Sequence, residues 1–163
     1  MKKILLTTIM LAASYALAAE PAPPAPAPAP TIVGKWNLTS RACTSNAAIN
    51  DGVKIGTDTV AIDNKADNTF EYSMTVGGCL TTVKGAYVAD GMKVDYTTAT
   101  SQGCKDADAH PMVDTYTTFY AYLSDTEAVT VTTGDKAAMS CPAGDALVMH
   151  FSKEVPTPAP VQP

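Results

Sequence analysis

Four cysteines and two histidines are the side chains in this chain with the most specific chemistry. Structural metal sites use closely spaced ligand pairs such as Cys-x-x-Cys, and neither the cysteines nor His110 and His150 have such spacing. A catalytic nucleophile needs a base within reach and a third group to orient that base. His110 lies in a polar segment before a proline, and His150 alternates with apolar residues, so neither fits that role. We therefore predict no metal site, no cofactor and no enzymatic activity.

The cysteines fit disulfide chemistry better, because the N-terminus indicates export. Lys2 and Lys3 precede an apolar run over residues 4–11, and Ala16-Leu17-Ala18 is a small-x-small cleavage site. We predict a signal peptide over residues 1–18, whose apolar run is too short to span a bilayer, and a periplasmic or secreted mature protein. An even cysteine number then implies disulfides, with three possible pairings.

The remaining chain divides into one domain and two proline-rich arms. Residues 19–30 are an Ala/Pro-rich linker, and residues 154–163 have the same character. Such sequence favours extended polyproline II over packed structure, so we expect disordered termini. The domain spans residues 31–153, enough for one core. The formal net charge of −5 disfavours nucleic acid and anionic membrane surfaces as partners.

The domain is rich in strand-forming residues and turn signals, and it lacks helical periodicity. The predicted fold is all-β, an eight-stranded antiparallel up-and-down barrel. Gly77-Gly78 and Asp90-Gly91 predict two-residue hairpin turns. Loop 41–52 and the connections 99–112 and 133–144 then fall at one end, which predicts a cup with an open mouth. The expected strands cover residues 31–39, 53–62, 69–76, 79–88, 92–98, 113–123, 127–132 and 145–152.

This layout places all four cysteines at the mouth. If Asp90-Gly91 is the turn, Cys79 lies opposite Gln102 and near Cys104. If the first and last strands close the barrel, Cys43 approaches Cys141. We therefore favour the pairs Cys43–Cys141 and Cys79–Cys104, and the pairing of Cys43 with Cys79 and of Cys104 with Cys141 remains open.

The strand alternation also assigns side chains to the interior. A barrel of this size is filled by its own side chains or holds one small ligand. Tyr116, Thr118, Tyr120 and Tyr122 share one face of their strand, and Phe119 and Leu123 share the other, so either face could point inward. With the tyrosines inward, the candidate ligand-binding residues are Tyr72, Met74, Tyr96, Tyr116 and Tyr120. The other side chains expected inside are Trp36, Leu38, Val60, Ile62, Phe70, Val76, Val83, Tyr87, Met92, Val94, Val129, Val131, Leu147, Met149 and Phe151.

Gly34-Lys35-Trp36 in the first strand, after an export signal and before seven further strands, resembles the Gly-x-Trp motif of lipocalin-like (calycin) barrels. The resemblance implies that Trp36 packs across the closed end beneath a basic side chain, which Lys153 could supply. Gly34, Trp36 and Lys153 would then form a structural anchor. The Thr-Asp-Tyr motif of that family is absent, and Tyr122-Leu123-Ser124-Asp125 is the nearest sequence. The resemblance is therefore to a compact bacterial relative.

Three functional hypotheses follow. The first is an exported, non-enzymatic, monomeric barrel that binds a small apolar or amphipathic molecule. The second is a protein-binding or inhibitor module that contacts an envelope protein through its disulfide-tied loops. The third is a structural or stress-related envelope protein that uses the Ala/Pro arms as spacers.

Overall fold

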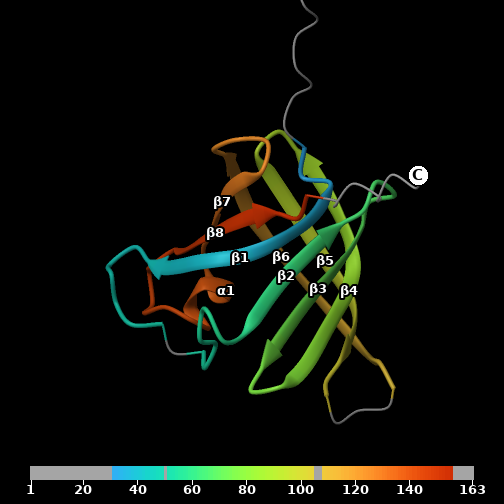
Figure 1. Ribbon diagram of the computed structural model, residues 1–163, viewed down its shortest axis with the longest axis horizontal. Coiled ribbons are helices and arrows are strands. Elements are labelled where there is room, and N and C mark those ends of the chain that lie inside the picture. The colour runs from blue at the N-terminus through green and yellow to red at the C-terminus, as the bar shows by residue number, and fades with distance from the viewer. Residues whose placement is uncertain (1–30, 50, 105–107, 156–163) are drawn as a thin grey trace, which may run out of the picture.

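A computed structural model describes residues 31–49, 51–104 and 108–155 of the chain (Figure 1). The predicted signal peptide, linker and most of the proline-rich tail lie outside these residues. Eight strands form a closed antiparallel barrel in sequence order, in which β1 also pairs with β8. No helix among the described residues is long and apolar enough to cross a membrane. The elements are β1 (Gly34–Cys43), β2 (Thr59–Asn64), β3 (Thr69–Val76), β4 (Cys79–Asp90), β5 (Lys93–Gln102), β6 (His110–Tyr122), β7 (Glu127–Thr132), α1 (Asp135–Ala138) and β8 (Leu147–Lys153).

The predicted all-β barrel is confirmed, while several element bounds differ. β2 begins at Thr59, because the chain before it turns at residues 56–57, between Ile55 and Asp58, which form an isolated bridge. β5 continues to Gln102 and β6 begins at His110, so half of the predicted connection 99–112 belongs to these strands. The helix α1 was not predicted. Its four residues are too few for a helical period to show in the sequence.

The β4–β5 turn lies one residue later than predicted. Asp90 pairs with Lys93, so Gly91 and Met92 form the turn, and the φ of Gly91 is 60°. Positive φ at a hairpin turn suits glycine, since it has no Cβ to clash with the backbone. As a result Met92, expected inside, is 65% exposed. The register places residue 102 opposite Thr82, which brings the residues after the end of β5 alongside Cys79.

The inward face of β7 is the reverse of the predicted one. Ala128, Thr130 and Thr132 are buried, whereas Val129 and Val131 are only partly buried on the other face. Residues alternate regularly between the two faces of β7, so the period of two alone could not predict which face points inward. The more apolar face was expected inside, and the structure places threonine hydroxyls there instead.

The two ends of the barrel differ in construction. The long segments between β1 and β2, β5 and β6, and β7 and β8 lie at one end, together with the tight β3–β4 turn (Figure 1). The other end has short turns, and there β1 begins and β8 ends. We call these ends the mouth and the closed end.

Trp36 seals the closed end. Its side chain is 1% exposed, and its indole N–H donates a hydrogen bond of 2.8 Å to the carbonyl oxygen of Ile32. The Lys153 ammonium lies 5.2 Å from the centre of the indole ring. Gly34 has a φ of 124°, and a Cβ there would come within 2.6 Å of Lys153 Cε. Glycine at this position therefore lets Lys153 cross the ring.

Two disulfides tie the mouth. Cys43 at the end of β1 is bonded to Cys141 before β8, and Cys79 at the start of β4 is bonded to Cys104 after β5. This is the pairing that the sequence favoured. Two disulfides indicate an oxidising environment outside the cytosol. The Cys43–Cys141 bond belongs to a small apolar cluster with Ala137 and Leu147 that supports α1.

Candidate functional site

The tyrosines of β6 point into the barrel. Tyr120 is 3% exposed and Tyr116 packs against the main core, whereas Phe119 and Leu123 on the opposite face are 46% and 62% exposed. Of the two faces of this strand that the sequence left open, the tyrosine face therefore points inward. All five candidate ligand-binding residues border the interior cavities described below.

A hydrogen-bonded group of polar side chains lies deep in the barrel. The Tyr96 hydroxyl donates to Asn64 Oδ1 at 3.1 Å and shares a 2.8 Å hydrogen bond with the Tyr120 hydroxyl. Asn64 is fully buried, so these bonds satisfy groups that water cannot reach. Burial raises the pKa of Tyr96, and it raises that of Tyr120 to about 12. Both hydroxyls are therefore neutral at physiological pH.

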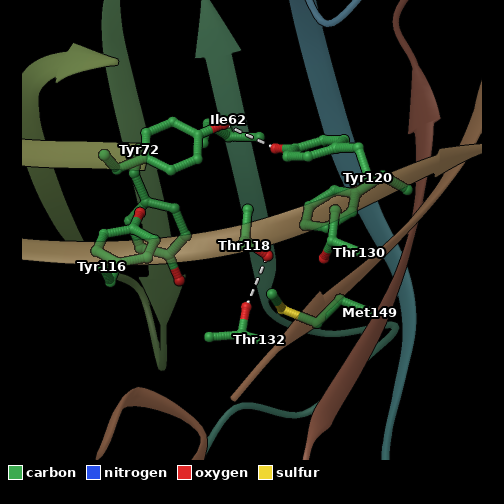
Figure 2. Close-up of a pocket in the computed structure, with 10 residues that line it drawn as sticks. Ile62, Tyr72, Tyr116, Thr118, Tyr120, Thr130, Thr132 and Met149 are labelled. Carbon is green, nitrogen blue, oxygen red and sulfur yellow. Dashed lines mark hydrogen bonds between the residues drawn. The ribbon is translucent and has the colours of Figure 1, made fainter. Parts of the chain in front are cut away.

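Beside this group is a small space, which we call the deep cavity, of about 50 Å³ (Figure 2). Thr118 and Thr132 share a hydrogen bond of 2.8 Å across neighbouring strands. Thr130 is 1% exposed, and its buried hydroxyl has no hydrogen-bond partner among the described residues. The wall of the deep cavity is made of Ile62, Tyr72, Tyr96, Tyr116, Thr118, Tyr120, Thr130, Thr132, Met149 and Phe151.

A larger space of about 400 Å³, which we call the mouth chamber, opens toward the loops. Tyr72, Tyr116, Thr132 and Met149 border both the mouth chamber and the deep cavity, so the two spaces adjoin. Most of the chamber wall is apolar, with Leu38, Val60, Met74 and Leu147 among its residues. A third space of about 240 Å³ adjoins the mouth chamber, and the residues that border both are Tyr72, Tyr116, Lys136 and Met139.

The rim of the chamber carries two ion pairs. Arg41 binds both carboxylate oxygens of Asp51 and donates to the Val53 carbonyl at 2.6 Å, and the Ser140 hydroxyl also donates to Asp51. Partial burial opposes ionisation of Asp51, but the Arg41 hydrogen bond and those from Val53 and Ser140 outweigh it and lower its pKa. The positive charge of Arg41 at the rim is therefore balanced by the carboxylate of Asp51.

Lys136 of α1 forms the second ion pair, with Asp114 of β6, and its ammonium lies 5.9 Å from the centre of the Tyr116 ring. The hydrogen bond from Lys136 lowers the pKa of Asp114. Because Ala137 is fully buried against the Cys43–Cys141 cluster, α1 is held where Lys136 reaches across the mouth. Lys136 therefore lies where the mouth chamber and the third space adjoin.

Sequence reasoning found the aromatic wall and missed the polar residues of the site. Thr130 was missed because β7 was assigned the wrong inward face. Arg41, Asp51, Asp114 and Lys136 come from different loops and strands, and no spacing along the chain links them. The pair of Arg41 and Asp51 comes closest to a signal in the sequence. Both residues lie in the predicted mouth loop 41–52, ten residues apart, and could have suggested a local ion pair.

Comparisons with protein-family models, curated proteins and solved structures found no match to this chain. The eight-stranded closed barrel itself agrees with the lipocalin-like layout. No group of three or more His, Cys, Asp or Glu side chains comes together in the described ranges in a way that could hold a metal ion.

Proposed function

We propose that this protein is an exported, monomeric, lipocalin-like carrier that binds one small apolar or amphipathic molecule in its mouth chamber. The observation that carries the proposal is the chamber of about 400 Å³, walled mostly by apolar side chains and open to the loops. Small-molecule sites commonly have volumes of roughly 300–1,000 Å³ and apolar walls with a few polar groups. The rim ion pairs and the tyrosine hydroxyls supply those polar groups.

The closed-end geometry supports the lipocalin-like part of this proposal. Gly34, Trp36 and Lys153 meet in the arrangement that the sequence resemblance implied. The predicted signal peptide and the two disulfides support export, and we place the mature protein in the periplasm or outside the cell. Cell fractionation with antibody detection would separate these two locations.

Binding can be tested with N-phenyl-1-naphthylamine, an uncharged dye whose fluorescence rises in apolar surroundings. We expect saturable binding to the wild-type protein. Met74→Trp should weaken this binding at least tenfold, because the larger side chain fills part of the chamber wall. The matched control is Leu80→Trp on the neighbouring strand, where the side chain is 52% exposed and borders none of these spaces. Equal binding by both variants, or none by the wild type, would contradict the proposal.

A protein contact at the mouth is the second candidate. Val113 is 84% exposed and Met139 is 71% exposed, and methionine is enriched at the cores of protein interfaces. In this case Val113→Ser, whose side chain borders none of the three spaces, would lose a cross-linked envelope protein that the wild type captures, while dye binding persists. Capture of the same protein by both would exclude this surface.

A further inference from the structure

The Thr130 hydroxyl is the one buried side-chain polar atom without a hydrogen-bond partner in the described part of the chain. Four other hydroxyls of the deep-cavity wall are paired, Tyr96 with Tyr120 and Thr118 with Thr132 (Figure 2). Native proteins satisfy nearly all buried polar groups, so an unpaired one that borders a cavity points to a missing partner. That partner has to fit into the deep cavity.

The size of the deep cavity restricts the partner. Its volume of about 50 Å³ exceeds the roughly 10–15 Å³ that one water molecule needs and is well below the roughly 150 Å³ of an apolar cavity that binds benzene. It therefore has room for a few non-hydrogen atoms and excludes a ring. A terminal hydroxymethyl group has this size.

The charge of the deep cavity restricts the partner further. No Lys, Arg, Asp or Glu side chain from the described residues borders it, and burial keeps the Tyr96 and Tyr120 hydroxyls neutral. A carboxylate or an ammonium there would be buried without a counter-charge, which is strongly unfavourable. A neutral hydroxyl can accept a hydrogen bond from Thr130 or donate one to it.

The adjoining mouth chamber offers room for the rest of such a molecule. Tyr72, Tyr116 and Met149 border both spaces, so a molecule in the mouth chamber lies next to the deep cavity that Thr130 borders. We propose that the ligand is an uncharged amphiphile with a terminal hydroxyl, bound hydroxyl-first at Thr130 with its apolar chain in the mouth chamber. This inference rests on the proposed carrier function and adds the ligand class and its orientation.

The test compares octan-1-ol with octanoate at pH 7 by displacement of N-phenyl-1-naphthylamine. Octan-1-ol should bind at least tenfold more tightly than octanoate. Thr130→Val keeps the shape of the side chain and removes its hydroxyl, so the affinity for octan-1-ol should fall about fivefold, the effect of one neutral hydrogen bond. Dye binding should not change, because the naphthyl rings are too large for the deep cavity.

Two further readouts distinguish a ligand partner from a structural water. With no partner in the free protein, Thr130→Val should leave the melting temperature unchanged or raise it. Thr132→Val is the matched control on the same face of β7, and it should lower the melting temperature because Thr132 is paired with Thr118. If Thr130→Val lowers the melting temperature and leaves the octan-1-ol affinity unchanged, the partner of the Thr130 hydroxyl is a bound water molecule. That result would overturn the inference.

The remaining outcomes separate this inference from the proposed function. Equal affinity for octan-1-ol and octanoate, with normal dye binding, would overturn the hydroxyl-first inference and leave the carrier function standing. A wild-type protein that binds neither the dye nor either octyl compound would overturn the carrier function, and the inference with it.

Discussion

The closed end and the mouth of this barrel are held together by different forces. At the closed end Trp36 is 1% exposed, its N–H is hydrogen-bonded, and Lys153 covers its ring. At the mouth the long segments are held by two disulfides and two ion pairs, and they surround open space. One end is stabilised by the burial of a large aromatic side chain, and the other by covalent and ionic links.

This difference has a physical reason. A cavity large enough for a ligand removes apolar contacts from the residues that line it, so the mouth cannot rely on close packing for stability. Disulfides and ion pairs fix the ends of long segments without filling the space between them. We therefore expect changes at the closed end to affect mainly stability, and changes at the mouth to affect mainly local order and binding.

The largest effect should come from Trp36→Ala at the closed end. Removing a buried aromatic side chain costs about 3–5 kcal/mol, because transfer energy is lost and a cavity remains. Urea unfolding followed by far-ultraviolet circular dichroism should show this loss in the free energy of unfolding. Trp36→Phe is the matched control and should cost less, since a phenyl ring still fills part of the site. An unchanged free energy of unfolding in Trp36→Ala would contradict the anchoring role.

Removal of the Cys43–Cys141 disulfide should follow in size. A native disulfide typically contributes about 2–4 kcal/mol, mainly by restricting the unfolded chain. The paired cysteines are 98 residues apart, against 25 for Cys79 and Cys104. The chain-entropy model then predicts that the double variant Cys43→Ser, Cys141→Ser loses about 1 kcal/mol more free energy of unfolding than the double variant Cys79→Ser, Cys104→Ser.

Thermal unfolding of these two double variants would check the order. The folded forms should keep the near-ultraviolet signal of Trp36, since both bonds lie at the opposite end. A greater loss on removal of Cys79–Cys104 would show that local packing outweighs the length of the closed loop.

A smaller effect is expected from Lys153→Met, which keeps the apolar stem of the side chain and removes its charge. A cation over an aromatic ring contributes about 0.5–1 kcal/mol when exposed and about 2 kcal/mol when desolvated. The matched control is Lys35→Met, whose partner Glu154 is solvent-exposed and whose loss should change stability little. Equal effects of the two variants in urea unfolding would show that the ring contact with Lys153 adds nothing specific.

The contrast between the two ends also explains which features the sequence predicted. Trp36, the turn glycines and the cysteines act through local patterns or through barrel closure, so their positions followed from alternation and topology. The misplaced β4–β5 turn still gave the right disulfide, because a shift of one residue leaves Cys79 near Cys104.

The polar parts of the site followed no such pattern. Thr130 and Val131 alternate equally well, and only the packing of the closed barrel decides which of them faces inward. Lys136 meets Asp114 because α1 is held by a cluster whose disulfide reaches back to Cys43 in β1. Such pairs depend on tertiary contacts between segments, and hydrophobic periodicity carries no information about them.

Gly85 is a further example of a constraint set by tertiary contacts. It lies in β4 at a shift of register against β5, and a Cβ there would come within 2.1 Å of the Thr97 carbonyl oxygen. A glycine inside a predicted strand can mark a close backbone approach.

The smallest effect concerns the charged rim, where acid should loosen the mouth and leave the closed end intact. The pKa values of Asp51 and Asp114 are lowered in the folded protein, so each carboxylate binds its proton more weakly there than in the unfolded chain. Their contribution is therefore fully present above the usual Asp pKa of about 3.9 and is lost as the pH falls through the lower folded value. Between pH 5 and 8 the rim should not change.

Hydrogen–deuterium exchange, corrected for intrinsic rates, would test this expectation segment by segment. Amides in residues 133–146 should exchange faster at about pH 2.5 than at pH 5–8, while those of β1 around Trp36 stay protected. Asp114→Asn should reproduce part of this change at pH 7, because it weakens the hold of Lys136 on β6. Asp95→Asn is the matched control, since the Lys93–Asp95 pair is exposed and away from the mouth chamber. Faster exchange at both ends in acid would mean that the barrel opens as a single unit and that the rim has no separate role.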